Sequence, residues 1–374
     1  MPPRRLRRPL LLVALSLACL VTASAAPAPS PGSVARPTAI TPLDPARPVT
    51  DLAFGSCLND PAHPMLARVL TLPMDLFLFL GDNIYADTTD MAVMRAKYDA
   101  LKTSDFFRTL RTRVPILATW DDHDLGANDA GADYPKLRES QAEFLRWLDE
   151  PADSPRRQRA GVYDAHIVGP PGRRVQIILL DTRTFRSPLR RAAKGEPALL
   201  GGPYRPLADP AATMLGETQW RWLREQLLRP AELRLIASSI QFVSEFSGGE
   251  AWANLPLEKQ RMLDLLRETR ATGVLFVSGD RHWCELSRMP GPTGYPLHDL
   301  TASALTEKHP RGTPTPNRYR LLPETYHDVN VGHLRIDWTD GDAALAWRIV
   351  DVDGRTRLEH RLRLRDLEPA PDPR

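Results

Sequence analysis

The sequence predicts an α/β fold in which mixed β-sheets are covered by helices. Before Leu297, short apolar runs of strand length recur along the chain, and longer segments whose apolar residues have helical spacing lie between them. After Leu297, strand-like segments are separated by turn signals. Three of the apolar runs end directly in clusters of Asp, His, Asn or Tyr, at the place where α/β folds carry their chemistry.

Each element is predicted from its own pattern. Apolar runs bounded by Gly, Asp or Ser predict buried strands at residues 50–55, 75–81, 114–120, 175–181, 233–239 and 274–279. Amphipathic segments predict helices at residues 91–110, 137–148, 217–228 and 257–270. Further strands are predicted at residues 331–337, 343–352 and 357–365, with hairpin turns at the Asp-Gly pairs 340–341 and 353–354.

The composition is that of an ordinary globular protein. The chain has 374 residues, of which 42% are hydrophobic and 25% charged, enough for a sizeable core. The formal net charge of +3 includes the arginines of residues 4–8, and without them the chain is close to neutral. No basic patch with interleaved aromatic residues occurs, so stable nucleic-acid binding is not expected.

Residues 1–25 are predicted to be a secretory signal peptide. Basic residues precede an apolar stretch too short to span a bilayer comfortably, and Ala23-Ser24-Ala25 has the pattern of a cleavage site. The alternatives are an uncleaved anchor, lipoprotein anchoring at Cys19 and a loosely matching twin-arginine signal. We expect a Pro- and Ala-rich linker over residues 26–47, one catalytic domain over 48–366 and a tail over 367–374. No other segment is apolar enough to cross a membrane, so the mature chain is expected to be periplasmic or secreted.

Residues 81–85, Gly-Asp-Asn-Ile-Tyr, form the first polar cluster. Asp82 could bridge two cations, and Tyr85 could bind one of them. A tyrosinate ligand favours a strong Lewis acid such as iron(III), because only such an ion lowers the phenol pKa from about 10 to below neutrality. The alternative is that Asp82 caps a turn and Tyr85 is a core aromatic side chain.

Residues 121–124, Asp-Asp-His-Asp, form the second cluster. Three acids around one histidine favour a bound metal ion, because their negative charges need compensation. Asp122 is therefore a candidate ligand, and Asn128 and Asp129 could add ligands or hold the loop. His123, whose pKa the acids should raise, could protonate a leaving group. The alternative is an exposed acidic turn.

The third cluster, residues 278–282, contains Asp280 and His282. These two residues alternate, so they are expected to point to the same side of an extended backbone and to chelate a metal; the alternative is a capped turn with a surface histidine. Arg183 or Arg186, after another predicted strand, could hold a phosphate oxygen. A structural ion pair between an arginine and Asp181 is the competing interpretation.

Two cysteines, Cys57 and Cys284, remain after removal of the leader. A disulfide is the simplest expectation in an oxidising compartment. However, Cys57 directly follows the first strand and Cys284 lies two residues after His282, so a thiolate could instead bind metal. The sequence leaves both alternatives open. The long irregular segments 186–215 and 309–328 are expected to cover the site.

In combination, these motifs resemble the alkaline phosphatase D (PhoD-like) family of metallophosphoesterases. The resemblance covers most of residues 50–306 and rests on segments 54–57, 81–85, 120–124, 180–183, 215–220 and 278–282, which occur in family order. It implies a four-layer α/β/β/α sandwich and a centre of iron(III) and calcium, with other divalent metals as alternatives. By position it implies that Cys57, Asp82 and Tyr85 bind the iron, with Asp82 bridging. We expect the chain to differ from longer relatives in lacking their N-terminal β-sandwich domain, and it carries Cys284 where many relatives have Ala.

We therefore expect a secreted or periplasmic enzyme that hydrolyses phosphate monoesters or diesters by means of a metal-bound hydroxide. The expected catalytic residues are His123 and Arg183. The expected metal ligands are Cys57, Asp82, Tyr85, Asp122, Asn128, Asp280 and His282. One alternative is a phosphodiesterase acting on lipid, nucleic acid or wall polymer. Another is a non-catalytic metal- or phosphate-binding protein of the envelope. The sequence does not decide the oligomeric state.

Overall fold

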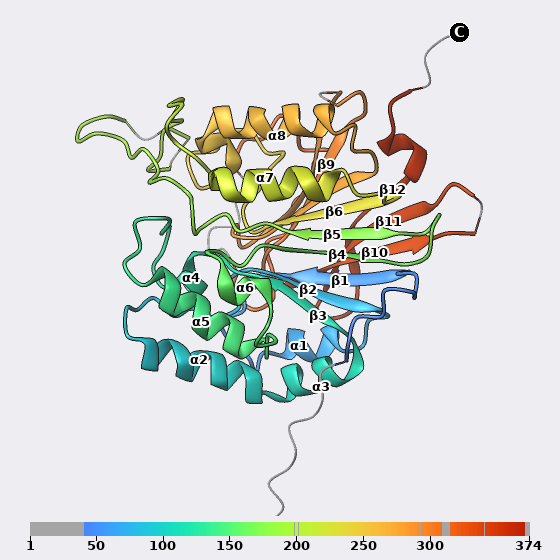
Figure 1. The fold of residues 1–374 in the computed structure, drawn as a ribbon, viewed down its shortest axis with the longest axis horizontal. Helices are drawn as coiled ribbons and strands as arrows, with labels where there is room; N and C mark the ends of the chain where they lie inside the picture. The colour runs from blue at the N-terminus through green and yellow to red at the C-terminus, as the bar shows by residue number, and fades with distance from the viewer. Residues whose placement is uncertain are drawn as a thin grey trace, which may run out of the picture. The chain divides into compact units, whose positions relative to one another are not determined.

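The computed structural model describes residues 41–370, apart from 198, 201, 292, 309–314 and 340. These residues form two six-stranded mixed sheets that pack face to face, with helices on both outer sides (Figure 1). The expected α/β/β/α sandwich is therefore confirmed. The predicted signal peptide and most of the predicted linker lie outside the described residues.

The first sheet joins strands from both ends of the described chain. Its parallel strands are β1 (Asp51–Gly55), β2 (Leu76–Leu80) and β3 (Ile116–Thr119). Its antiparallel strands are β10 (Asn330–Asp337), β11 (Ala344–Asp351) and β12 (Thr356–Arg363), in the order β12-β11-β10-β1-β2-β3. Because β1, β2 and β3 are parallel, the polar residues that follow them meet at one edge of the sheet.

The second sheet has the order β4-β5-β6-β7-β9-β8. The strands are β4 (Asp164–Val168), β5 (Val175–Leu179), β6 (Leu233–Ser238), β7 (Val274–Ser278), β8 (Cys284–Met289) and β9 (Leu297–Ala302). The four strands β5, β6, β7 and β9 are parallel, and the edge strands β4 and β8 are antiparallel to their neighbours. The sequence did not predict β4, β8 and β9, because each contains charged or hydroxyl side chains in place of a continuous apolar run.

Helices cover the outer face of each sheet (Figure 1). The first sheet is covered by α1 (Pro64–Val69), α2 (Met91–Thr103), α3 (Asp105–Arg113) and α5 (Leu137–Trp147), and the second by α7 (Gly216–Leu227) and α8 (Pro256–Glu268). The remaining short helices are α4 (Asp122–Leu125), α6 (Pro155–Gln158), η1 (Trp252–Asn254) and η2 (Leu364–Leu367). The prediction of one helix over residues 91–110 is wrong. Ser104 ends α2 and caps α3, since its hydroxyl accepts a hydrogen bond from the Phe107 N–H at 3.2 Å.

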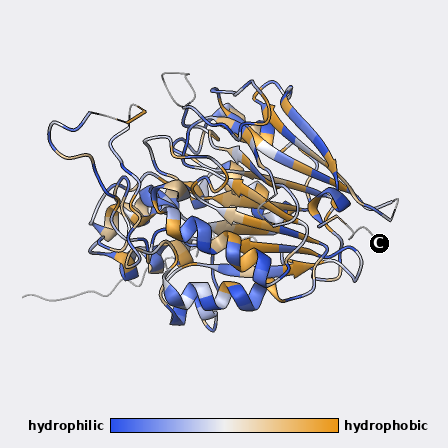
Figure 2. Cartoon of the chain, turned by 90° about the horizontal axis from the view of Figure 1, so that it is seen from above, coloured by the Kyte–Doolittle hydropathy of each residue, from blue (hydrophilic) through white to orange (hydrophobic). Residues whose placement is uncertain are grey.

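Apolar side chains form two cores. One fills the space between the sheets and under α7 and α8, and the other lies between the first sheet and its helices. In Figure 2 the strands of the interior are mainly hydrophobic, whereas the helices turn hydrophilic residues outward. Within the part of the chain that the structure describes, no helix has both the length and the apolar character needed to span a bilayer.

Both ends of the described chain pack against the sandwich. Thr41, in the predicted linker, donates its N–H to the Arg111 carbonyl at 2.9 Å, and the Pro45 carbonyl accepts a hydrogen bond from Gly169 at 2.9 Å. Leu367 is buried in η2, and its carbonyl accepts a hydrogen bond from Gly273 at 2.8 Å. Packed structure therefore extends one residue past the domain boundary expected at residue 366.

Phe79 is a sensitive test of the core under the first sheet. It is fully buried, and its ring centroid lies 5.5 Å from that of Trp147 and 6.3 Å from that of Phe107. We expect Phe79→Ala to lower the free energy of unfolding by about 3–5 kcal/mol, because it leaves a cavity between β2 and the helices. Val93→Ala, at an exposed position of α2, should change it by less than about 0.5 kcal/mol. Urea unfolding followed by circular dichroism measures both, and equal losses would contradict this description of the core.

Candidate metal centre

Polar residues gather where the parallel strands of both sheets end. They are Cys57 after β1, Asp82 after β2, Asp121 and Asp122 after β3, and Asp280 and His282 after β7. Gly81 allows this convergence. It has a φ of 103°, and a Cβ atom at this position would lie only 2.6 Å from the Asp121 Cβ atom. A glycine therefore lets the ends of β2 and β3 approach each other closely.

Several of these residues have a left-handed backbone. The φ angles are 62° for Cys57, 49° for Asp82, 69° for Asp280 and 58° for His282. The expectation that Asp280 and His282 extend from a strand-like backbone is therefore wrong. The chain turns sharply after β7, and the two side chains join different groups of potential ligands. Non-glycine residues adopt this conformation at a cost of about 1–3 kcal/mol each, and such residues cluster at functional sites.

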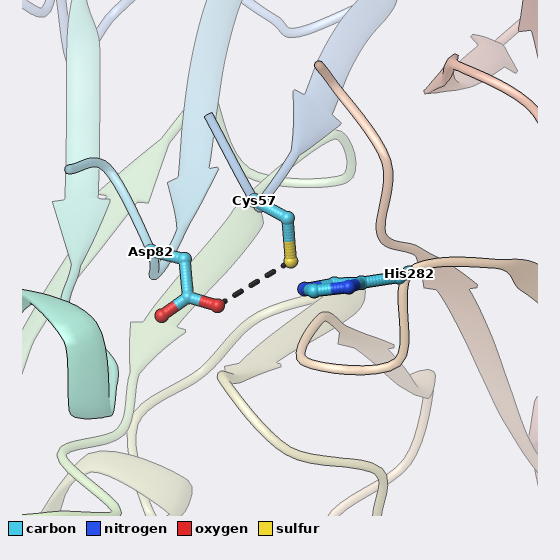
Figure 3. Close-up of side chains that lie close together, drawn as sticks. All are labelled: Cys57, Asp82 and His282. Carbon is cyan, nitrogen blue, oxygen red and sulfur yellow. Dashed lines mark hydrogen bonds between the residues drawn. The ribbon is translucent and has the colours of Figure 1, made fainter. Parts of the chain in front are cut away.

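The first group of potential ligands consists of Cys57, Asp82 and His282. Figure 3 shows the three side chains converging from the ends of β1 and β2 and from the turn after β7. One ligand atom from each lies within 4.8 Å of the others, and the Cys57 thiol donates to Asp82 Oδ2 at 3.4 Å. Tyr85 joins them, because its hydroxyl lies 3.0 Å from His282 Nε2. A thiol, a carboxylate, an imidazole and a phenol thus surround one point.

His123 lies beside this group. Its ring centroid is 4.1 Å from that of Tyr85, and its Nδ1 is 2.7 Å from Asp87 Oδ1. Burial lowers the pKa of His123, but Asp122 and Asp87 outweigh burial and raise it above its ordinary value. The side chain of His123 remains 15% exposed, so it can meet a substrate. Asp87 was not predicted from the sequence, although its position two residues after Tyr85 places it in the same loop.

Further carboxylates complete two more groups. Asp82, Asp122 and His123 form one, and Asp121, Asp122 and Asp280 form the other. Burial raises the pKa of Asp82, Asp121 and Asp280. Burial also acts to raise the pKa of Asp122, but Arg183 and His123 hold it below its usual range.

Two carboxylate oxygens of these groups lack a partner. Asp82 Oδ1 and Asp121 Oδ2 are buried and have no hydrogen-bond donor among the described residues. Buried carboxylate charge needs compensation, and unpaired oxygens at the meeting point of four acids supply ligands for hard cations. The residues present therefore fit bound metal ions.

Arg183 and Arg186 lie behind the carboxylates. Both side chains are at most 1% exposed. Arg183 donates from Nε to Asp121 and from Nη1 to Glu250 Oε1 at 2.9 Å, and Arg186 Nη2 lies 3.2 Å from Glu250 Oε1. The structural ion pair is thus present, but its acids are Asp121 and Glu250. Asp181, the expected partner, accepts from the Arg183 backbone N–H at 3.0 Å. A direct role for Arg183 in catalysis stays a prediction.

The loop after α4 contributes Asp129. Its N–H donates to Asp122 Oδ2 at 2.6 Å, and Asp122, Asp129 and Glu250 form a further group of potential ligands. Tyr204, from the long segment 186–215, donates its hydroxyl to Asp129 and so closes this side of the site. Asn128 is exposed beside it, and its role as a ligand stays a prediction. Glu250 was not predicted from the sequence, because no strand-end motif surrounds it.

Cys57 and Cys284 are both free and buried, so the disulfide alternative is not realised in the structure. Cys284 begins β8, and its backbone N–H donates to the Tyr326 carbonyl at 2.8 Å. Burial raises the pKa of both thiols. Cys57 alone of the two belongs to a group of potential metal ligands.

Comparison with known proteins shows the fold and the family of the chain. A solved structure of PhoD has a TM-score of 0.64 and 14% sequence identity, over 85% of this chain and 73% of that one, which shows a shared fold. Alkaline phosphatase D of Bacillus subtilis (strain 168) is 21% identical over 285 residues, which are 63% of this chain and 46% of that protein. The chain thus spans about half the length of this curated relative. The family model of the PhoD-like phosphatase matches residues 52–315, more than half of the chain. The chain therefore belongs to the PhoD-like phosphatase family.

Proposed function

We propose that this protein is a metal-dependent phosphoesterase that hydrolyses phosphate monoesters, diesters or both. The observation that carries the proposal is the convergence of Cys57, Asp82, Asp122, Asp280 and His282 at one edge of the sandwich, in a chain of a phosphatase family. Such a site holds cations beside carboxylates. Metal ions bound there would neutralise the charge of a phosphate group and activate water.

In this proposal His123 protonates the leaving oxygen. Asp87 accepts a hydrogen bond from Nδ1 of the protonated ring, and the Tyr85 ring packs against one face of the imidazole. The raised pKa of His123 keeps the ring protonated nearer neutrality, so Nε2 can supply a proton. Arg183 acts as a positioning residue, because its ion pairs hold Asp121 and Glu250 in place.

The proposed metals are iron(III) and calcium. Cys57 and Tyr85 supply a thiol and a phenol, and a strong Lewis acid is required to deprotonate a buried phenol. Asp122, Asp129 and Glu250 offer oxygen atoms alone, which is the ligand set that calcium prefers. Other divalent metals that accept the same donors are the alternative.

The proposed location is the periplasm or the exterior of the cell. The support is the basic, then apolar, then small-residue pattern of residues 1–25. These residues lie outside the part that the structure describes.

The proposal is tested on the full chain exported by its host. Bound metals are quantified, and turnover of p-nitrophenyl phosphate and of bis-p-nitrophenyl phosphate is measured. Hydrolysis of either ester that is abolished by chelation is the expected result. Binding of inorganic phosphate without turnover of any ester would favour a binding protein instead.

Replacement of His123 tests the general acid. We expect His123→Asn to lower kcat by about 10²–10⁴-fold, because the leaving oxygen loses its proton donor. Metal content should remain that of the wild type if His123 is not a ligand. Steady-state kinetics and elemental analysis measure both, and unchanged turnover would remove His123 from the mechanism. Asp105→Asn, at an exposed site in α3, is a matched control and should leave kcat unchanged.

Replacement of Tyr85 tests the identity of the metal. An iron(III)–phenolate bond gives a visible charge-transfer band, so the wild-type protein should be coloured and Tyr85→Phe should lose the band. Tyr134→Phe is the control, since the Tyr134 hydroxyl donates to the Thr88 carbonyl at 2.6 Å and lies outside the groups of potential ligands. A colourless wild-type protein that contains other metals would contradict the assignment of iron but not the proposed phosphoesterase activity.

Removal of the metals should make stability depend on pH. Burial raises the pKa of Glu250 to about 7, and it raises those of Asp82, Asp121 and Asp280. In the metal-free protein these carboxyls favour folding while they are protonated. Their contribution is fully present below the unfolded pKa of about 4 and is lost as the pH rises through the folded values.

The difference in Tm between metal-loaded and chelated protein should therefore widen from pH 5 to pH 8. Protonation of histidines that do not bind metal shifts the Tm of both forms equally, so it does not contribute to the difference in Tm. Differential scanning calorimetry of both forms at three pH values measures it. A difference that narrows with rising pH would contradict the proposal that these acids are compensated by metal.

A further inference from the structure

Arg281 lies between Asp280 and His282, and its guanidinium has few partners. Its Nη1 makes one long hydrogen bond, 3.5 Å to the Glu250 carbonyl, and lies 3.8 Å from Asp280 Oδ2. Its Nε is buried and has no hydrogen-bond acceptor among the described residues. The side chain is only 10% exposed, so water does not easily satisfy it. A guanidinium has five N–H donors, and leaving buried donors unpaired is costly.

The other buried arginines of the site differ in their ion pairs. Arg183 Nη2 and Arg186 Nε also lack an acceptor among the described residues, but both guanidinium groups are held by short ion pairs. Arg183 and Arg186 are bound to Asp121 and Glu250 and carry at most 1% exposure. Moving either guanidinium toward a substrate would leave a buried carboxylate without its cation. Arg281 can instead accept a new anionic partner without breaking a short ion pair. Of the three, it is the arginine whose donors fit an incoming anion.

Two neighbours hold the Arg281 guanidinium in place. Its Cζ lies 4.5 Å from the centroid of the Trp283 ring, a cation–π arrangement that orients the plane of the group. On another side, a Cβ atom at Gly249 would lie 2.5 Å from Arg281 Nη1. Gly249 does not have a positive φ, so this position requires glycine for space rather than for backbone conformation. The loop before η1 thus leaves a space at Gly249 that the Arg281 guanidinium occupies.

We propose that Arg281 binds a non-bridging oxygen of the substrate phosphate. The proposal rests on the proposed phosphoesterase function. Asp280, adjacent in sequence, belongs to a group of potential metal ligands, so Arg281 lies where phosphate would approach the metals. The planar fork of a guanidinium matches two oxygens of one phosphate, which a lysine ammonium cannot do. Arg281 thereby supplies the substrate contact that sequence analysis assigned to Arg183 or Arg186.

The test measures phosphate binding and catalysis separately in the metal-loaded full chain. Inorganic phosphate is titrated calorimetrically, and KM and kcat are measured with p-nitrophenyl phosphate. We expect Arg281→Gln to raise the Kd of phosphate and the KM by about 10–100-fold, because a charged hydrogen bond to the anion is lost. Metal content should be unchanged. Arg281→Lys should recover only part of the loss.

A second variant displaces the guanidinium without removing it. Gly249→Ala places a methyl group 2.5 Å from Arg281 Nη1, too close for both to keep their positions, and should likewise raise the Kd of phosphate. Arg288→Gln, at an exposed position of β8, removes an equal charge and should change neither constant. Equal phosphate affinity in wild type, Arg281→Gln and Gly249→Ala would overturn the assignment while leaving the phosphoesterase proposal intact. Failure of the metal-loaded wild type to bind phosphate or hydrolyse any ester would overturn both.

Discussion

The structure depends on keeping several carboxylates buried together at the edge where two sheets meet. Asp82, Asp121, Asp122, Asp280 and Glu250 all lie there with little solvent contact. Arg183 and Arg186 compensate part of this negative charge. One oxygen of Asp82 and one of Asp121 have no hydrogen-bond partner among the described residues, so the compensation is incomplete. A group of buried acids persists in a folded protein only when cations or protons neutralise it. The fold therefore places at this edge a set of acids that bound cations or protons must neutralise.

The ion pairs of Arg183 also join the two halves of the sandwich. Asp121 follows β3 of the first sheet, whereas Arg183 follows β5 of the second, and Glu250 comes from the loop before η1. Ser239, after β6, adds a hydrogen bond to Asp121 at 2.5 Å. The relative position of the two sheets is thus fixed at the same place where their ligands must meet. Arg183 can control the geometry of the site in this way, through the acids that it holds in place.

The sequence predicted the strands whose residues form one uninterrupted apolar run. Apolar runs ending in glycine or aspartate located β1, β2, β3, β5, β6 and β7, and with them Cys57 and Asp82. The edge strand β8 was missed because it buries Glu285 and Ser287, which hydrogen-bond to groups far away in the sequence. Glu250 was missed for the same reason, since only the folded chain brings it to Arg183. Asp280 and His282 were predicted from their residue types. Their left-handed backbone was not, because an alternating pattern of residues does not indicate a positive φ angle.

Backbone strain and buried charge occur at the same residues, and this coincidence constrains how the site can be built. Cys57, Asp82 and His282 each hold a left-handed conformation while contributing to one group of potential ligands. Close approach at Gly279, where a Cβ atom would collide with the Ser56 hydroxyl, leaves little room for these turns to relax. Both costs are borne by the folded state before any metal binds. Metal binding would then offset the charge cost but not the strain, so the sandwich around the site must supply the rest of the stability.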